Sequence, residues 1–182
     1  ALYSWGAGLS GRLGHGDARN QSRPKRVAAL EGVFVRHAAA GRTHSFAVGS
    51  GGEIFSWGDG NFGALGHGGT EGALTPKRVA ALAGTPVRQV SGGDGNSAVL
   101  TEAGEVFTFG CGGDGQLGHG SNESELLPRH VEGLVAIEDG IGAAWVDAGT
   151  LPFPPPQPEA QALLGPADLA IAHCDSEGHA CV

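Results

Sequence analysis

The sequence predicts an all-β fold, a partial β-propeller of four-stranded antiparallel blades with an irregular C-terminal tail. Three observations support this prediction: a repeat of 52 residues, short apolar segments separated by polar turns, and 34 glycines among 182 residues. A fixed period near 50 residues is typical of arrays of supersecondary units such as propeller blades. Glycine supplies the positive φ angles that tight turns between short strands require.

The repeat is clearest in residues 53–68, where an apolar strand leads through a glycine-rich turn to a Leu-Gly-His-Gly corner. The same strand and corner occur 52 residues earlier and 52 residues later, and the run Pro-Lys-Arg-Val-Ala-Ala-Leu is identical in 24–30 and 76–82. We therefore divide residues 1–150 into the units 1–52, 53–104 and 105–150. The third unit is partly decayed, because its spacing falls to 45 residues before a proline-rich stretch interrupts the next strand. Residues 151–182 are expected to form a Pro-rich, disordered tail.

Each unit is expected to contain four short strands, which in the first unit lie near 25–30, 33–38, 45–48 and 54–57. A hairpin turn at 50–52 joins the last two of these strands. The exact period also predicts that Ile54 and Trp57 are buried at the same structural positions as Val106 and Phe109.

Composition and charge narrow the possible functions. A net charge of −8 disfavours binding to nucleic acid, which requires a basic face. No apolar stretch reaches the 18 residues of a membrane span. Three cysteines are too few for a disulfide framework, so we expect an intracellular protein, cytoplasmic or nuclear. No nucleophile–base pair and no cofactor fingerprint is recognisable, so we expect no catalytic residues, no cofactor and no enzymatic activity.

Residues that recur at the period are interpreted as structural. The three corner histidines suggest a metal ring at first sight, but equivalent positions on successive blades point apart, whereas zinc ligands lie about 2.0–2.1 Å from one ion. We therefore expect no metal site. The residues assigned to the structural repeat are Trp5, Gly14, His15, Gly41, His44, Trp57, Gly66, His67, Phe109, Gly118 and His119.

These elements resemble the regulator of chromosome condensation repeat family, whose members fold as seven-bladed β-propellers. The resemblance rests on Ser-Trp-Gly, Gly-x-Leu-Gly-His-Gly, Pro-(Lys/Arg)-x-Val and the Gly-x-x-His-Ser of 41–45. The Gly-x-x-His element is complete once, because Asn96 replaces the histidine in the second unit. Seven units need about twice the residues present, so the chain is identified as a partial or truncated member.

The resemblance implies a non-catalytic module for protein–protein interaction that regulates a small GTPase by guanine-nucleotide exchange. The alternative is a regulatory or substrate-recruiting segment of a larger ubiquitin ligase. A light-sensing role, as in a plant UV-B photoreceptor of this family, needs a tryptophan after the glycine of Gly-x-x-His, where this chain has Arg42 and Asp94.

The segments 17–23, 69–75 and 121–127 differ between units that otherwise agree, so we predict that they bind the partner. The candidate residues are Asp17, Arg19, Arg23, Glu71, Glu123 and Glu125.

Overall fold

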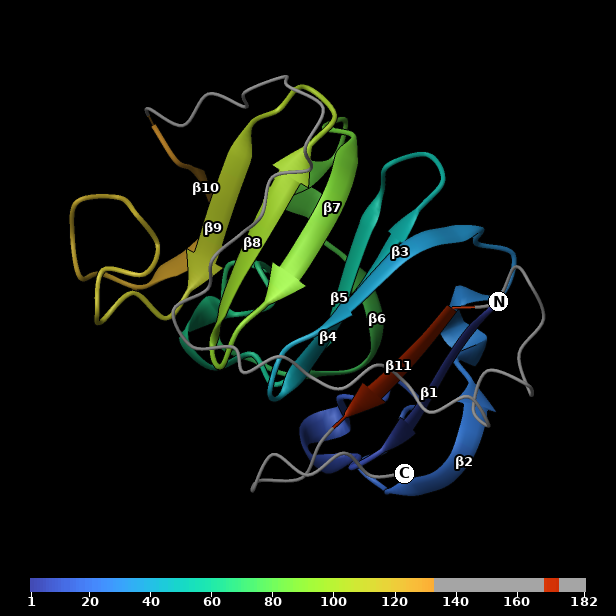
Figure 1. The fold of residues 1–182 in the computed structure, drawn as a ribbon. Helices are drawn as coiled ribbons and strands as arrows, with labels where there is room; N and C mark the ends of the chain where they lie inside the picture. The colour runs from blue at the N-terminus through green and yellow to red at the C-terminus, as the bar shows by residue number, and fades with distance from the viewer. Residues whose placement is uncertain (133–168, 174–182) are drawn as a thin grey trace.

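The computed structural model describes residues 1–132 and the strand at 169–173 (Figure 1). The strands in these ranges are five or six residues long. The strands are β1 (Leu2–Gly6), β2 (Gln21–Arg26), β3 (Val35–Ala40), β4 (His44–Gly49), β5 (Ile54–Gly58), β6 (Ala73–Arg78), β7 (Val87–Gly92), β8 (Asn96–Thr101), β9 (Val106–Gly110), β10 (Glu125–His130) and β11 (Leu169–His173). Four short 3₁₀ turns connect them: η1 (Leu9–Gly11), η2 (Ala28–Leu30), η3 (Asn61–Gly63) and η4 (Ala80–Leu82).

The strands form two complete blades and one smaller sheet, which confirms the prediction of an all-β partial propeller. In the first blade β3, β4, β5 and β6 are neighbours in that order, and in the second blade β7, β8, β9 and β10. All pairs within these two blades are antiparallel. None of the helical segments in the described part of the chain has the length and hydropathy that a membrane span needs.

The blades are not grouped as the repeat predicted. The strand expected at 25–30 ends at Arg26 and is followed by the 3₁₀ turn η2, which buries Leu30 beside Val27. Strand β2 pairs with the preceding strand β1 instead of with the strands that follow it, just as β6 pairs with β5. Each blade therefore takes its last two strands from the following sequence unit, and the two complete blades span residues 35–78 and 87–130.

The equivalent core positions are confirmed. Ile54 and Trp57 in β5 are 2% and 0% exposed, and Val106 and Phe109 in β9 are 5% and 0% exposed. Within each strand the two residues are three positions apart, so they point to opposite faces of the blade and belong to different buried clusters.

The two blades share one hydrophobic core. Strands β3 and β4 pack against β7 across the blade boundary. Phe46 of the first blade lies edge-to-face with Phe109 of the second, with ring centroids 6.3 Å apart. Val87 and Val90 belong to the same buried cluster. Burial across this boundary makes each blade depend on its neighbour for stability, as expected for repeat folds.

The smaller sheet contains a strand that the repeat did not predict. Strand β11 runs parallel to β1, with Leu2 opposite Leu169 and Gly6 opposite His173. It occupies the position beside β1 that β4 occupies beside β5, although β4 is antiparallel to its neighbour. These five residues belong to the segment expected to be an irregular tail, so at 169–173 the structure differs from that expectation. The rest of the expected tail, and the decayed part of the third unit, lie outside the described residues.

Candidate functional site

One end of the blades carries the long loops, and we call it the loop face. His44 at the start of β4 pairs with Gly58 at the end of β5, which also pairs with Ala73 at the start of β6. The segments 41–43 and 59–72 therefore meet at the same end, and 93–95 and 111–124 do so in the second blade. The hairpin turn at 50–53 lies at the opposite end of the first blade.

Each corner histidine takes part in a hydrogen-bonded link between a strand hydroxyl and the corner loop, which we call the corner bracket. Ser56 Oγ donates a hydrogen bond to the Leu65 carbonyl at 2.7 Å and lies 3.1 Å from His67 Nε2. Because the hydroxyl proton goes to the carbonyl, His67 Nε2–H donates to the hydroxyl oxygen. The same bracket joins Ser4 to His15 and Thr108 to His119. This geometry supports the structural interpretation of all three histidines.

Burial favours the neutral form of His15 and of His67. Desolvation is the main cause that lowers the pKa of His15 and of His67 below its ordinary value. The three histidines bind separate corners, and the described residues contain no group of three or more His, Cys, Asp or Glu side chains that could hold a metal ion.

Glycine is required at the corner itself. Gly14, Gly66 and Gly118 have φ angles of 76°, 71° and 75°. A Cβ atom at Gly66 would lie 3.0 Å from the Phe109 ring, and one at Gly14 would lie 2.8 Å from Trp57 Nε1. These two corners therefore lie directly over the aromatic residue of the following blade, and backbone conformation and close contact both exclude a side chain.

His44 connects the two complete blades from inside the core. Its Nε2 lies 3.1 Å from Ser97 Oγ, which donates to the Ala64 carbonyl at 2.8 Å. Gly41 leaves room for the imidazole, since a Cβ there would lie 2.5 Å from His44 Cε1. Burial lowers the pKa of His44 to about 4, so it is neutral at physiological pH.

The two tryptophans at equivalent positions are core residues. Trp5 is 9% exposed and Trp57 is 0% exposed. Trp57 Nε1 donates to the Arg12 carbonyl at 2.8 Å, which ties the first blade to the corner of the preceding sheet. The same carbonyl accepts a hydrogen bond from Ser45 Oγ at 2.7 Å.

The six residues predicted to bind a partner are spread over the loop face and the outer strands. The Asp17 carboxylate accepts a hydrogen bond from the Arg19 backbone N–H at 3.0 Å, and Arg19 is exposed. Glu71 and Glu123 are exposed in the loops that precede β6 and β10. Arg23 and Glu125 lie in strands β2 and β10, and Glu125 forms an ion pair with Arg129. These segments are therefore half loop and half outer strand.

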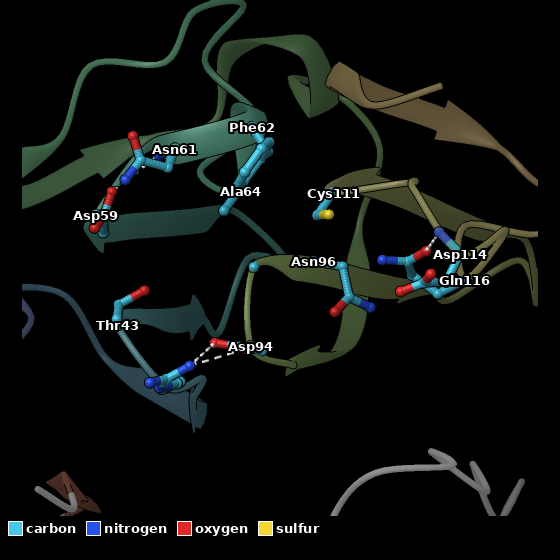
Figure 2. Close-up of a pocket in the computed structure, with 12 residues that line it drawn as sticks. Thr43, Asp59, Asn61, Phe62, Ala64, Asp94, Asn96, Cys111, Asp114 and Gln116 are labelled. Atoms are coloured by element: carbon cyan, nitrogen blue, oxygen red, sulfur yellow. Dashed lines mark hydrogen bonds and ion pairs between the residues drawn. The ribbon is translucent and has the colours of Figure 1, made fainter. Parts of the chain in front are cut away.

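A cavity that the sequence did not reveal opens on the loop face between the two complete blades (Figure 2). Its volume is about 420 Å³, and its walls come from the segments 42–43, 59–64, 94–96 and 111–116. The polar lining residues include Asp59, Asn96, Asp114 and Gln116, and the thiol of Cys111 also faces it. A signal was present in the sequence, because the turn after each Ser-Trp-Gly or Thr-Phe-Gly differs between units: Ala-Gly-Leu-Ser, Asp-Gly-Asn-Phe and Cys-Gly-Gly-Asp.

Charges of both signs surround this cavity. Arg42 Nη1 contacts both carboxylate oxygens of Asp94, at 3.1 Å and 3.0 Å, across the blade boundary. Asp59 accepts hydrogen bonds from the Asn61 backbone N–H at 2.9 Å and from Ser10 Oγ at 3.5 Å. Within residues 1–132, no basic side chain forms a salt bridge with Asp59 or Asp114. The cavity is therefore polar and negatively charged.

Comparison with known proteins places this geometry in a family. The human E3 ubiquitin-protein ligase HERC2 is 42% identical over 135 residues, which is 73% of this chain and 3% of HERC2. The Ultraviolet-B receptor UVR8 of Arabidopsis thaliana is 39% identical over 144 residues, which is 79% of this chain and 33% of the receptor. The chain thus spans a third or less of these relatives.

Solved structures show the same fold. Prp20p from Saccharomyces cerevisiae superposes with a TM-score of 0.64 at 22% identity, over 70% of this chain and 33% of Prp20p. Human WBSCR16 superposes with a TM-score of 0.62 at 29% identity, over 69% of this chain and 32% of that protein. The family model for the regulator of chromosome condensation (RCC1) repeat matches residues 1–48, 51–100 and 103–148. The chain therefore belongs to the RCC1 repeat family.

Proposed function

We propose that this chain is a non-catalytic β-propeller module that binds a protein partner through its loop face. One observation carries the proposal: the scaffold is the same in successive units, whereas the loop-face residues differ. The corner brackets of Ser4, Ser56 and Thr108 have the same geometry in each unit, because packing constrains them. The loops that these brackets hold are free to vary, and variable loops on a rigid scaffold are typical of binding surfaces.

Within this function, the first candidate is regulation of a small GTPase by guanine-nucleotide exchange. Exchange needs no covalent chemistry, because a partner that distorts the nucleotide site is sufficient to release the nucleotide. The structure of Prp20p was described together with its binding to Gsp1p and histones. Regulation of a GTPase is proposed for the present chain on family membership, and we propose the cytoplasm or the nucleus as its place of action.

The second candidate is a regulatory or substrate-recruiting segment of a larger ubiquitin ligase. The observation that favours it is the 42% identity to human HERC2, a ligase of which the matched segment is 3%. The matching 42% identity to the human probable E3 ubiquitin-protein ligase HERC3 over 75% of this chain supports the same candidate. In this case the propeller selects the substrate and a separate domain transfers ubiquitin.

A single set of experiments separates the two candidates. The whole protein is mixed with a panel of small GTPases loaded with a fluorescent GDP analogue, and nucleotide release is followed over time. Exchange activity predicts faster release from at least one GTPase. If no GTPase that binds the protein releases its nucleotide faster, the exchange candidate is wrong. Partners recovered on the protein are then tested for ubiquitin transfer, and loss of that transfer on loop-face substitution would support the ligase candidate.

A further inference from the structure

The loop-face cavity between the two complete blades has the features of a site for one extended cation. Figure 2 shows Asp59 and Asp114 on opposite sides of the open space, with Asn96 and Cys111 between them. A volume of about 420 Å³ falls within the roughly 300–1,000 Å³ of ligand pockets. The two carboxylates together make the cavity attractive to a positive charge.

The charges of the cavity select the sign of its ligand. Of the three carboxylates in the wall, Asp94 is already paired with Arg42, whereas Asp59 and Asp114 have no salt-bridge partner within residues 1–132. Phosphate groups are repelled by such a wall, which makes a nucleotide a poor occupant. A compact metal ion fits no better, because the described residues do not gather three or more acidic, His or Cys groups around one point.

An aromatic side chain forms part of the same wall. Phe62 is 55% exposed and has a φ angle of 60°, at a position where the preceding unit has Ser10 with a φ of 59°. Its ring reaches from the first blade towards Gly95 of the second, since a Cβ at Gly95 would lie 3.7 Å from Phe62 Cδ2. Exposed phenylalanine rings are attractive surfaces for cations, arginine more often than lysine.

From these observations we infer that the cavity accepts an arginine side chain presented by the protein partner. A guanidinium is planar, carries five donors, and stacks on aromatic faces while it hydrogen-bonds to carboxylates. The Phe62 ring offers a face for stacking, and the carboxylates of the wall supply acceptors and a negative potential. A lysine ammonium uses these features less well because it is a point charge. The inference rests on the proposed binding function and specifies the chemistry of the partner: an exposed arginine on a loop or extended peptide.

The thiol of Cys111 provides a site-specific readout, because it lines the cavity and is half-buried. The rate of its alkylation by iodoacetamide is measured on the whole protein by mass spectrometry of the peptide that contains it. The protein is titrated with acetyl-Gly-Arg-Gly-amide, and with the same peptide carrying lysine or citrulline in place of arginine. We expect saturable protection by the arginine peptide, weaker protection by the lysine peptide and none by the citrulline peptide.

Variants assign the protection to the named side chains. Asp59→Asn keeps the oxygen that accepts from the Asn61 N–H, so it removes the charge with little change in the loop. Of Asp59→Asn and Asp114→Asn, the one that removes the carboxylate paired with the guanidinium should raise the half-protecting concentration about ten-fold or more, the cost of one charged hydrogen bond, and the other should raise it by less. Phe62→Ser, matched to Ser10, should raise it several-fold. Glu105→Gln, which removes an exposed carboxylate at the opposite end of the second blade, should leave it unchanged.

Three results would overturn the inference: no saturable protection, equal protection by the citrulline peptide, or protection that survives both aspartate substitutions. Failure of the inference and failure of the proposed function are distinguishable. If Asp59→Asn and Asp114→Asn bind a protein partner as tightly as the parent does, the cavity is not the arginine site and the binding function stands. If the arginine peptide protects Cys111 but no protein partner depends on the loop face, the binding function is wrong and the cavity remains a cation site.

Discussion

Lowering the pH should destabilise this chain through His44, by an amount that the buried imidazole determines. The pKa of His44 falls from 6.5 to about 4 in the folded chain, chiefly because burial disfavours the charged form. Between these two values the unfolded chain binds a proton that the folded chain does not. The contribution of neutral His44 to the free energy of unfolding is therefore complete above about pH 6.5 and is lost as the pH falls towards 4.

The size of the effect follows from the pKa gap. A gap of roughly 2.5 units corresponds to about 3 kcal/mol of unfolding free energy, at about 1.4 kcal/mol for each unit. At pH 5 the imidazole of the unfolded chain is mostly protonated, and about 2 kcal/mol is already lost. Acidic groups also titrate in this range, so a matched variant is needed to isolate the histidine.

His44→Asn supplies this control, because Asn96 already occupies the equivalent position in the second blade. The free energy of unfolding is measured by urea titration at several pH values between 8 and 4 for both proteins. The variant should be less stable at pH 8, since it loses the edge-to-face contact between His44 and Phe46. It should lose less stability than the parent on acidification. Parallel pH profiles for the two proteins would refute the assignment of this term to His44.

Three further predictions concern the corners and the loop face. Gly66→Val should destabilise the chain more than Gly118→Val, because both residues have a positive φ but a Cβ at 118 meets nothing closer than Val131 at 3.5 Å. Comparison of the two melting temperatures tests this, and equal losses would argue against the contact between Gly66 and Phe109. Ser56→Ala should lower the free energy of unfolding by about 1–3 kcal/mol because it leaves the Leu65 carbonyl without its donor, whereas Ser56→Thr, which copies the bracket at 108, should be tolerated. If the bracket is unimportant, denaturant titration would show the opposite order of stability for the two variants. Glu123→Lys should weaken binding to a basic partner while it changes stability by about 0–1 kcal/mol, as exposed charges do; unchanged affinity in a binding titration would move the surface away from this loop.

The recurring residues were enough to predict which positions are structurally equivalent. Trp57 and Phe109 occupy one structural position because an exact shift of 52 residues places them at the same point of the same strand. The corner glycines could also be inferred, since they recur at the period in a tight turn, where glycine supplies a positive φ. These features depend on contacts between residues that are close in the sequence or related by the repeat.

Strand pairing and the cavity were decided by the tertiary structure. The repeat gives the order of the strands but not the point where one blade ends and the next begins. It could therefore not show that β6 belongs to the same sheet as β3, β4 and β5. Strand β11 pairs with β1 across more than 160 residues and follows no period. The cavity combines four loops from two blades, and each loop separately resembles an ordinary turn. The repeat thus determined the unit, while the long-range packing of one unit against the next determined which side chains face a common space.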